Sequence, residues 1–295
     1  MDKFVFGAKN GESEMPNGHS NGVVKTKKKI KYGVIPAAGA GKRLGYLSGL
    51  LPKTLFPVYD RPIIHYVVDL MQGIGIEEIY IIVNVHKEKV MEYFDLVQMD
   101  IRANIHFIEQ TEVSGTGEAI LLAEKYTNGE PFIVVYGDDC TVTNSLLPMV
   151  DSFFLNNPTV MEVVVRENNK KVLQQTCSVK LTNNGKMIEI IEKPENPPYM
   201  MRGCGVYLFN NDIYDYIRKT PVHPIRKEKE ITYTIDRLAK EGRAFGHVIN
   251  GHNININDHE QLLKASHLVR MLKHDMLEDY DGDEDESYRF DTDMM

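Results

Sequence analysis

Residues 35–44 read Ile-Pro-Ala-Ala-Gly-Ala-Gly-Lys-Arg-Leu, and residues 52–58 read Pro-Lys-Thr-Leu-Phe-Pro-Val. The apolar run at 32–37 predicts a strand that ends in this loop of small residues. Because Gly and Ala leave little bulk above the backbone, the N–H groups of such a loop can approach a polyphosphate closely. Arg43 and Lys53 add two cations to the loop and its return. We therefore expect an anion-binding site at the carboxyl end of the first strand.

Two common phosphate-binding motifs do not fit this loop. A Walker loop requires Gly five residues before the Gly-Lys pair and Ser or Thr after it, and Pro36 and Arg43 occupy those positions. The dinucleotide-binding fingerprint requires Gly where Leu44 stands, and no clear acidic residue follows the next strand. The loop is therefore not a P-loop, and a dehydrogenase is disfavoured.

Strand and helix patterns alternate after the loop. Residues 78–83 form a continuous β-branched run, which is typical of a strand buried on both faces. The alternation predicts right-handed βαβ units, and the fold class is α/β with a Rossmann-like doubly wound, mixed but mostly parallel sheet. Beyond residue 151 we expect an antiparallel extension with a hairpin turn at 183–185. The other predicted strands are 105–108, 132–136, 160–166, 177–181, 187–191 and 206–209, and the predicted helices are 62–71, 88–94, 117–125, 212–218, 231–240 and 258–272.

Charge is unevenly distributed along the 295 residues. Residues 275–295 hold ten acidic residues and one arginine, so the remainder of the chain, whose total charge is −8, is close to neutral. This balance argues against a nucleic-acid or membrane partner. The basic run at 25–31 is interpreted as a solvated strand entry rather than a nuclear or nucleic-acid signal. We expect a disordered leader at 1–30, one folded domain at 31–272 and an acidic disordered tail at 273–295.

Compartment and metal content follow from what the sequence lacks. No run approaches the roughly 18 apolar residues of a membrane span, and the N-terminus has no signal-peptide core, so we expect a cytoplasmic protein. The three cysteines and ten histidines have no zinc-ligand spacing and no disulfide pattern.

Three motifs together carry a family resemblance. Ala-Ala-Gly-x-Gly-x-Arg-Leu at 37–44, Pro-Lys-x-Leu-x-Pro-Val at 52–58 and Arg-Pro-Ile-Ile at 61–64 resemble the sugar-1-phosphate nucleotidylyltransferases. The glucose-1-phosphate thymidylyl- and uridylyltransferases look most similar, and the likeness extends over 31–269. It implies an enzyme that joins a nucleoside triphosphate, UTP or dTTP, to a sugar 1-phosphate and releases pyrophosphate with Mg²⁺. It also implies a nucleotide-binding half at 31–150, a sugar-phosphate half at 151–272, and a dimer or tetramer.

The resemblance assigns catalytic roles to Arg43, Lys53 and Asp138. Arg43 would hold the triphosphate, and Lys53 would stabilise the α-phosphate as the reaction proceeds. Asp138, in a Gly-Asp pair after an apolar strand, matches the magnesium-binding aspartate of the family. Gln110 and Gly115 would bind the base. The other expected nucleotide-binding residues are Ala38, Gly39, Ala40, Gly41, Lys42 and Thr116.

The second metal ligand and the acceptor site come from later segments. Asn255 matches a position where many members have aspartate, and it is either a magnesium ligand or an Asx cap of the next helix. Asp139 would share the metal or face solvent. The resemblance assigns Glu192 to sugar hydroxyls and Lys193 to the sugar phosphate. Gly205 would let the sugar lie against the backbone.

Two other functions remain open. A cytidylyltransferase acting on a polyol phosphate, phosphocholine or a phosphonate would share the nucleotide half, and Lys42 stands where many sugar enzymes carry Thr. A non-catalytic nucleotide-sugar-binding subunit is a second alternative. The presence of Arg43, Lys53 and Asp138 disfavours that subunit, because such relatives often lose these groups.

Overall fold

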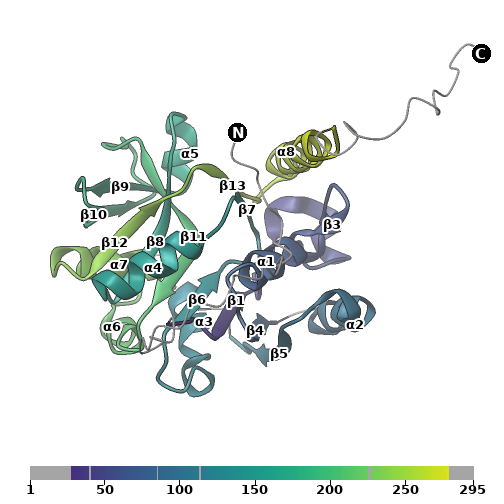
Figure 1. Ribbon diagram of the computed structural model, residues 1–295, viewed down its shortest axis with the longest axis horizontal. Helices are drawn as coiled ribbons and strands as arrows, with labels where there is room; N and C mark the ends of the chain where they lie inside the picture. The colour runs from purple at the N-terminus through teal and green to yellow at the C-terminus, as the bar shows by residue number, and fades with distance from the viewer. Residues whose placement is uncertain (1–27, 40, 85, 113, 225–226, 279–295) are drawn as a thin grey trace, which may run out of the picture.

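A seven-stranded mixed sheet forms the centre of the computed structural model, which describes residues 28–39, 41–84, 86–112, 114–224 and 227–278 (Figure 1). Its strand order is β12-β8-β11-β6-β1-β4-β5. β11 is antiparallel to both of its neighbours, and the other neighbouring strands pair in parallel. The predicted fold class is confirmed. The strands are β1 (Tyr32–Pro36), β4 (Glu78–Val83), β5 (Asn104–Glu109), β6 (Phe132–Val135), β8 (Val160–Arg166), β11 (Met201–Phe209) and β12 (Ala244–Val248).

Helices cover both faces of this sheet. Successive strand residues point to opposite faces, so Ile35 of β1 joins the core beneath α1, α2 and α4, while Val34 joins the core beneath α3, α6 and α7. A strand covered on both faces must be apolar throughout, as the 78–83 run predicts. The helices are α1 (Ile63–Gln72), α2 (Lys87–Val97), α3 (Thr116–Leu121), α4 (Leu147–Asn156), α5 (Lys170–Gln175), α6 (Ile213–Lys219), α7 (Ile231–Lys240) and α8 (His259–Glu278), with short 3₁₀ turns at Lys42–Gly49, Lys53–Leu55, Gln98–Asp100 and Glu124–Tyr126.

Three two-stranded sheets complete the fold. β9 (Cys177–Leu181) and β10 (Met187–Glu192) form the predicted antiparallel extension, with Gly185 in the left-handed conformation that their turn requires. β2 (Pro57–Val58) pairs with β3 (Arg61–Pro62). The sequence analysis did not predict the third pair, β7 (Asp139–Thr143) with β13 (Gly251–Asn255).

A separate apolar cluster fixes the glycine loop in place. Leu44, directly after Arg43, is fully buried and lies in one cluster with residues of α1, β7 and α8, including Val269, and with Ile256, which follows β13 (Gly251–Asn255). The loop is therefore anchored at its far end as well as at β1.

Some element limits differ from those predicted. The helix predicted at 117–125 ends at Leu121 and is followed by a turn, and β11 begins at Met201 rather than at 206. α8 continues six residues past its predicted end, and Ile30, in the predicted leader, is buried. Residues 1–27 and 279–295, most of the predicted leader and tail, lie outside the described residues. No described helix is both long and apolar enough to cross a bilayer.

Candidate active site

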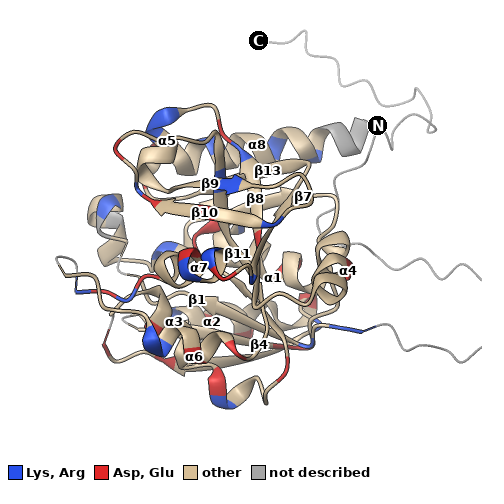
Figure 2. Ribbon diagram, turned by 90° about the vertical axis from the view of Figure 1, so that its left-hand side faces the viewer, with Lys and Arg blue, Asp and Glu red and all other residues tan. Residues whose placement is uncertain are grey.

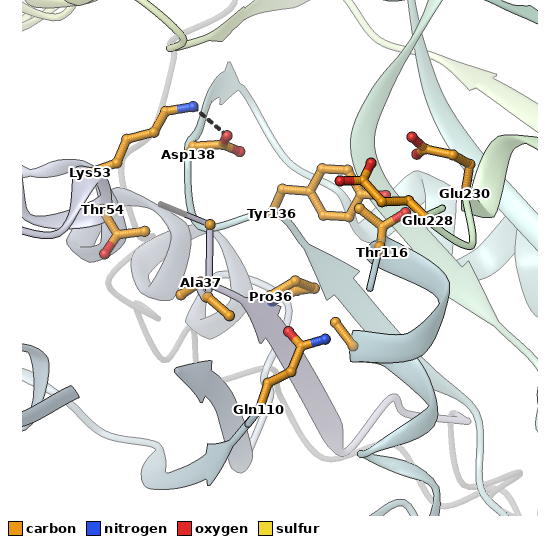
Figure 3. A pocket seen from close by; sticks show the side chains of 14 residues that line it. Pro36, Ala37, Lys53, Thr54, Gln110, Thr116, Tyr136, Asp138, Glu228 and Glu230 are labelled. Carbon is orange, nitrogen blue, oxygen red and sulfur yellow. Dashed lines mark hydrogen bonds and ion pairs between the residues drawn. The ribbon is translucent and has the colours of Figure 1, made fainter. Parts of the chain in front are cut away.

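Two adjoining cavities open at the carboxyl ends of β1 and β6. The first has a volume of about 220 Å³ and the second about 270 Å³. Thr116, Tyr136, Asp138 and Glu230 line both of them, so the two cavities form one elongated site. Figure 3 shows the first cavity, with Gln110 at one end and the Lys53–Asp138 pair at the other.

Predicted nucleotide-binding residues line the first cavity. Ala38 and Gly39 follow β1, and Thr116 begins α3. Gln110 lies at the end of β5, where its backbone N–H donates to the Val83 carbonyl at 2.8 Å, and its side chain is almost fully buried. The β5 register therefore directs this amide into the cavity beside the glycine loop (Figure 3).

The glycines of this cavity serve different needs. Gly115 has φ +111°, and a Cβ there would lie 2.6 Å from the backbone nitrogen of Lys229. The fold itself therefore requires glycine at position 115. A Cβ on Gly39 would meet no atom of the described residues within 4 Å, and Gly39 lines the cavity. Open space therefore adjoins its backbone.

The remaining predicted loop residues are only partly accounted for. Gly41 lines neither cavity. A Cβ added to Gly41 would lie 3.0 Å from the Cβ of Lys53, so glycine lets the loop backbone pass close to Lys53. Ala40 lies outside the described residues, and of Lys42 the backbone alone is described.

A lysine–aspartate ion pair occupies the junction of the two cavities. Lys53 Nζ lies 2.5 Å from Asp138 Oδ2 and 3.0 Å from Asn257 Oδ1. Asn255 donates from Nδ2 to Asp138 Oδ1 at 3.5 Å, and Asn257 donates to Asn255 Oδ1. Three segments distant in sequence thus converge on one carboxylate.

The β7–β13 pair causes this convergence. Asn255 is in register with Asp139, so the end of β13 lies beside the start of β7 and next to Asp138. The alternative role for Asn255, capping the next helix, belongs instead to Asp258, whose Oδ1 accepts from the Gln261 backbone N–H at 2.9 Å.

The Asp139 side chain does not face solvent, and it does not contact Lys53 or Asn255, the partners of Asp138. It is fully buried and accepts hydrogen bonds from the Gly205 backbone N–H at 3.1 Å, from Thr141 and from Asn253. Burial raises the pKa of Asp139 to about 6, and the Asp138 charge adds to the rise. Asp139 therefore ties β7 to β11 and β13, and the expectation that it faces solvent is wrong.

The second cavity brings together the predicted acceptor residues Glu192, Lys193 and Gly205. Arg43, predicted to hold the triphosphate, lines this cavity and not the first. Lys193 Nζ lies 3.1 Å from Glu192 Oε1. Arg43 forms no ion pair within the part of the chain that the structure describes, so its guanidinium is available to an anion.

Several residues of the site were not predicted. Thr232, at the start of α7, donates to Glu192 Oε2 at 2.9 Å and fixes its orientation. Asn257 bonds Lys53. A signal for Asn257 was present, because asparagines at 253, 255 and 257 alternate in the sequence and an extended strand places them on one face.

Charges of both signs are mixed over the fold. Figure 2 shows acidic and basic residues next to one another along the ribbon, without a face reserved for either sign. A nucleic-acid footprint would require a continuous basic surface. Arg43, Lys53 and Lys193 line the two cavities.

A family model described as nucleotidyl transferase matches residues 32–270. The chain belongs to this family. The family resemblance and the enzyme class, nucleotidyl transfer, are therefore confirmed. Individual residue roles stay predictions.

The chain is also similar to named proteins. The UTP–glucose-1-phosphate uridylyltransferase YngB of Bacillus subtilis (strain 168) is 34% identical over 159 residues, which cover 46% of this chain and 54% of that protein. The match thus spans about half the length of this relative. A UTP–glucose-1-phosphate uridylyltransferase of Streptococcus pyogenes is 28% identical over 269 residues, 81% of this chain and 88% of that protein. A candidate glucose-1-phosphate thymidylyltransferase from Bacillus anthracis, crystallised with sucrose, has a TM-score of 0.74 and 25% identity, covering 82% and 95% of the two chains.

Proposed function

We propose that this nucleotidyl transferase transfers the uridylyl group of UTP to a sugar 1-phosphate, with glucose 1-phosphate as the first acceptor to test. The observation that carries the proposal is the Lys53–Asp138 pair at the junction of the two cavities. The names of the Bacillus subtilis and Streptococcus pyogenes relatives support UTP and glucose 1-phosphate. Thymidylyl transfer from dTTP is the nearest variant of the same reaction.

The first cavity would hold the nucleotide. The Gln110 amide offers one donor and one acceptor, which matches the edge of a uracil or thymine base. The backbone beside Gly115 would complete the base pocket, and the open backbone at Ala38 and Gly39 would lie along the phosphates. This cavity supports a pyrimidine nucleoside triphosphate as donor substrate.

The second cavity would hold the acceptor. Lys193 would bind its phosphate, and Glu192, held by Thr232, would accept hydrogen bonds from sugar hydroxyls. An oxygen of the acceptor phosphate attacks the α-phosphorus, a P–O bond forms, and the bond from α-phosphorus to the bridging oxygen breaks to release pyrophosphate. The attacking phosphate is already ionised near neutral pH, so no general base is required.

Cations would supply most of the rate acceleration. Lys53 would stabilise charge on the α-phosphate, and Arg43 would balance charge on the departing pyrophosphate. Each group acts by position and charge, since the reaction needs no covalent enzyme intermediate.

The donor set beside Lys53 fits Mg²⁺. Asp138 would contribute a carboxylate and Asn255 an amide oxygen. In the structure the Asn255 Nδ2 donates to Asp138 and its Oδ1 accepts from Asn257, so the amide would turn over to present its oxygen to the metal. Magnesium takes one or two carboxylates and completes its shell with phosphate oxygens and water. Bound there, Mg²⁺ would neutralise phosphate charge.

A substrate panel tests the proposal. Wild type is assayed for pyrophosphate release with UTP, dTTP, CTP and ATP, each with glucose 1-phosphate, a polyol phosphate and phosphocholine. We expect the highest kcat/KM with UTP and glucose 1-phosphate. A preference for CTP with phosphocholine would indicate the cytidylyltransferase, and nucleotide binding without turnover would indicate a binding subunit. Either result would refute the proposal.

Two variants test the site. Arg43→Ala and Asp138→Ala should each lower kcat by on the order of 100-fold or more. Lys264→Ala is the control, because Lys264 is exposed on α8 and pairs with Glu260. Near-normal rates in both site variants would show that the catalytic residues are misassigned. The cytoplasmic location, the oligomeric state and the division into halves at residue 150 stay predictions.

A further inference from the structure

Glu162 lies in the acceptor-side cavity and has no role in the mechanism above. It belongs to β8, lines the second cavity and is 1% exposed. Its Oε2 atom has no hydrogen-bond partner among the described residues. A buried carboxylate oxygen without a partner is costly to the fold, so its retention beside a substrate cavity calls for an explanation.

The fold makes room for this carboxyl group in a specific way. β11 pairs with β8 with a shift in register between Gly203 and Tyr207, which is a bulge opposite this part of β8. A Cβ on Gly203 would lie 1.9 Å from Glu162 Oε1. The carboxyl group therefore occupies space that exists because residue 203 is glycine.

The surroundings compensate Glu162 only in part. Burial raises its pKa well above the usual range and the Glu192 charge adds to the rise, while a side-chain hydrogen bond with Tyr207 and the Arg202 charge oppose it. The guanidinium of Arg202 is directed elsewhere, because both its terminal nitrogens donate to Asn253 at 2.6 Å. Cys177, which also lines the cavity, carries no compensating charge.

The cations of the cavity lie on other residues. Lys193 would take the acceptor phosphate, whereas Glu162 and Glu192 supply carboxyl groups and no cation. The acceptor would therefore bind with its phosphate at Lys193 and its remaining polar groups at the carboxyls.

We propose that Glu162 is a specificity residue, whose Oε2 accepts a hydrogen bond from a hydroxyl or amino group of the phosphorylated acceptor. This inference rests on the proposed function. A site that hydrogen-bonds one substrate group rejects analogues that lack it, because the buried partner is then left unsatisfied.

The test compares Glu162→Met and Glu162→Gln with wild type. The acceptors are glucose 1-phosphate, its 2-, 3-, 4- and 6-deoxy analogues and glucosamine 1-phosphate, with UTP as donor. Met is similar in length but accepts no comparable hydrogen bond, whereas Gln keeps an acceptor oxygen. Glu189→Gln, on β10 and outside the cavity, is the matched control.

We expect wild type to discriminate against one deoxy analogue by about 10- to 100-fold in kcat/KM. In Glu162→Met, the ratio of kcat/KM for glucose 1-phosphate to kcat/KM for that analogue should approach one. The ratios for the other analogues and the KM for UTP should not change. Glu162→Gln should retain part of the wild-type discrimination. A preference for glucosamine 1-phosphate that disappears in Glu162→Met would identify the group as an amine. The Tm of Glu162→Met should equal or exceed that of wild type, because an unpartnered buried carboxyl is removed.

Other results would overturn the inference. If every deoxy ratio is the same in wild type and Glu162→Met, Glu162 does not contact the acceptor. A fall in Tm or failure to fold, with equal losses for UTP and acceptor, would show a structural role. In both of these outcomes wild type still transfers the uridylyl group, so the proposed function stands while this inference fails. Absence of transfer by wild type to any of these acceptors would instead refute the proposed function, and this inference with it.

Discussion

Lys53 Nζ and Asp138 Oδ2 lie 2.5 Å apart, although 85 residues separate them in sequence. Lys53 follows the glycine loop, whereas Asp138 follows β6, so the pair joins the two neighbouring strand ends. The lysine side chain is 8% exposed and the aspartate 29%. The ion pair is therefore partly desolvated, and each charge fixes the position of the other.

Removing Lys53 should reduce catalysis more than stability. We expect Lys53→Met to lower kcat by on the order of 100-fold, since a charge at the α-phosphate is lost. A double-mutant cycle with Asp138→Asn should give a coupling free energy of unfolding of about 1 kcal/mol, modest because the aspartate is partly solvated. Urea unfolding and single-turnover assays measure the two quantities. A cycle without coupling would mean that the ion pair does not form in solution.

Two glycines of the nucleotide cavity should respond in opposite ways to alanine. Gly115→Ala places a Cβ 2.6 Å from the Lys229 backbone at a positive φ, so the free energy of unfolding should fall by about 2 kcal/mol or more. Gly39→Ala meets no protein atom, so its Tm should match wild type while the KM for UTP rises about 10-fold. Thermal scans and initial rates measure both effects. Unchanged UTP binding in Gly39→Ala would place the triphosphate elsewhere.

The hydrogen bond from Thr232 to Glu192 should affect the acceptor alone. Thr232→Val keeps the shape of the side chain but removes the donor, and we expect the acceptor KM to rise about fivefold, equivalent to about 1 kcal/mol. Thr234→Val, on the same helix, is the matched control. The Thr234 hydroxyl lies 2.7 Å from the Thr220 hydroxyl, and neither residue lines the two cavities. Thr234→Val should lower Tm without changing either KM. Equal KM changes in the two variants would contradict a positioning role.

Asp at position 255 should strengthen metal binding. Asn255→Asp adds a second carboxylate beside Asp138, so the Mg²⁺ concentration for half-maximal activity should fall by about 10-fold. Without metal the two carboxylates repel, so the variant should be less stable than wild type and gain more in Tm when Mg²⁺ is added. If Mg²⁺ stabilises both proteins equally, residue 255 is not a ligand.

Asp139 should make stability depend on pH. Its pKa rises from 3.8 unfolded to about 6 in the fold, so the folded chain binds a proton that the unfolded chain releases. The free energy of unfolding therefore falls as pH rises through about 4 to 6. The total effect of this group is about 3 kcal/mol.

The comparison with Asp139→Asn isolates that contribution. Between pH 4 and pH 7, the difference in unfolding free energy should move in favour of the variant by up to about 3 kcal/mol. Glu260→Gln, an exposed change on α8, is the control. A constant difference between Asp139→Asn and wild type across this range would refute the assignment.

The elements that could be predicted from the sequence are those with a recognisable residue pattern within one short segment. The β4 run is apolar because both faces are covered, and the glycine loop is recognisable from its residues alone. β7 and β13 were missed because Asp-Cys-Thr-Val-Thr and Gly-His-Asn-Ile-Asn contain too few apolar residues for a buried-strand signal. Their pairing is a contact between distant segments, which no local window contains.

The same distinction applies to the site. Residues within motifs, such as Gln110 and Glu192, lie at the cavities as the family resemblance implies. The hydrogen bond from Thr232 to Glu192 and the position of Glu162 at the cavity depend on how α7 and β8 pack. Neither contact can be read from the sequence.

The late position of β13 has a consequence for synthesis on the ribosome. Lys53 and Asp138 emerge early, but Asn255 and Asn257 are translated well over a hundred residues after Asp138. At about 5–20 residues per second, roughly 6 to 23 seconds pass between the translation of Asp138 and that of Asn255. A transcript truncated upstream of β13 would yield a polypeptide that keeps the glycine loop, Lys53 and Asp138 but lacks both asparagines that contact them.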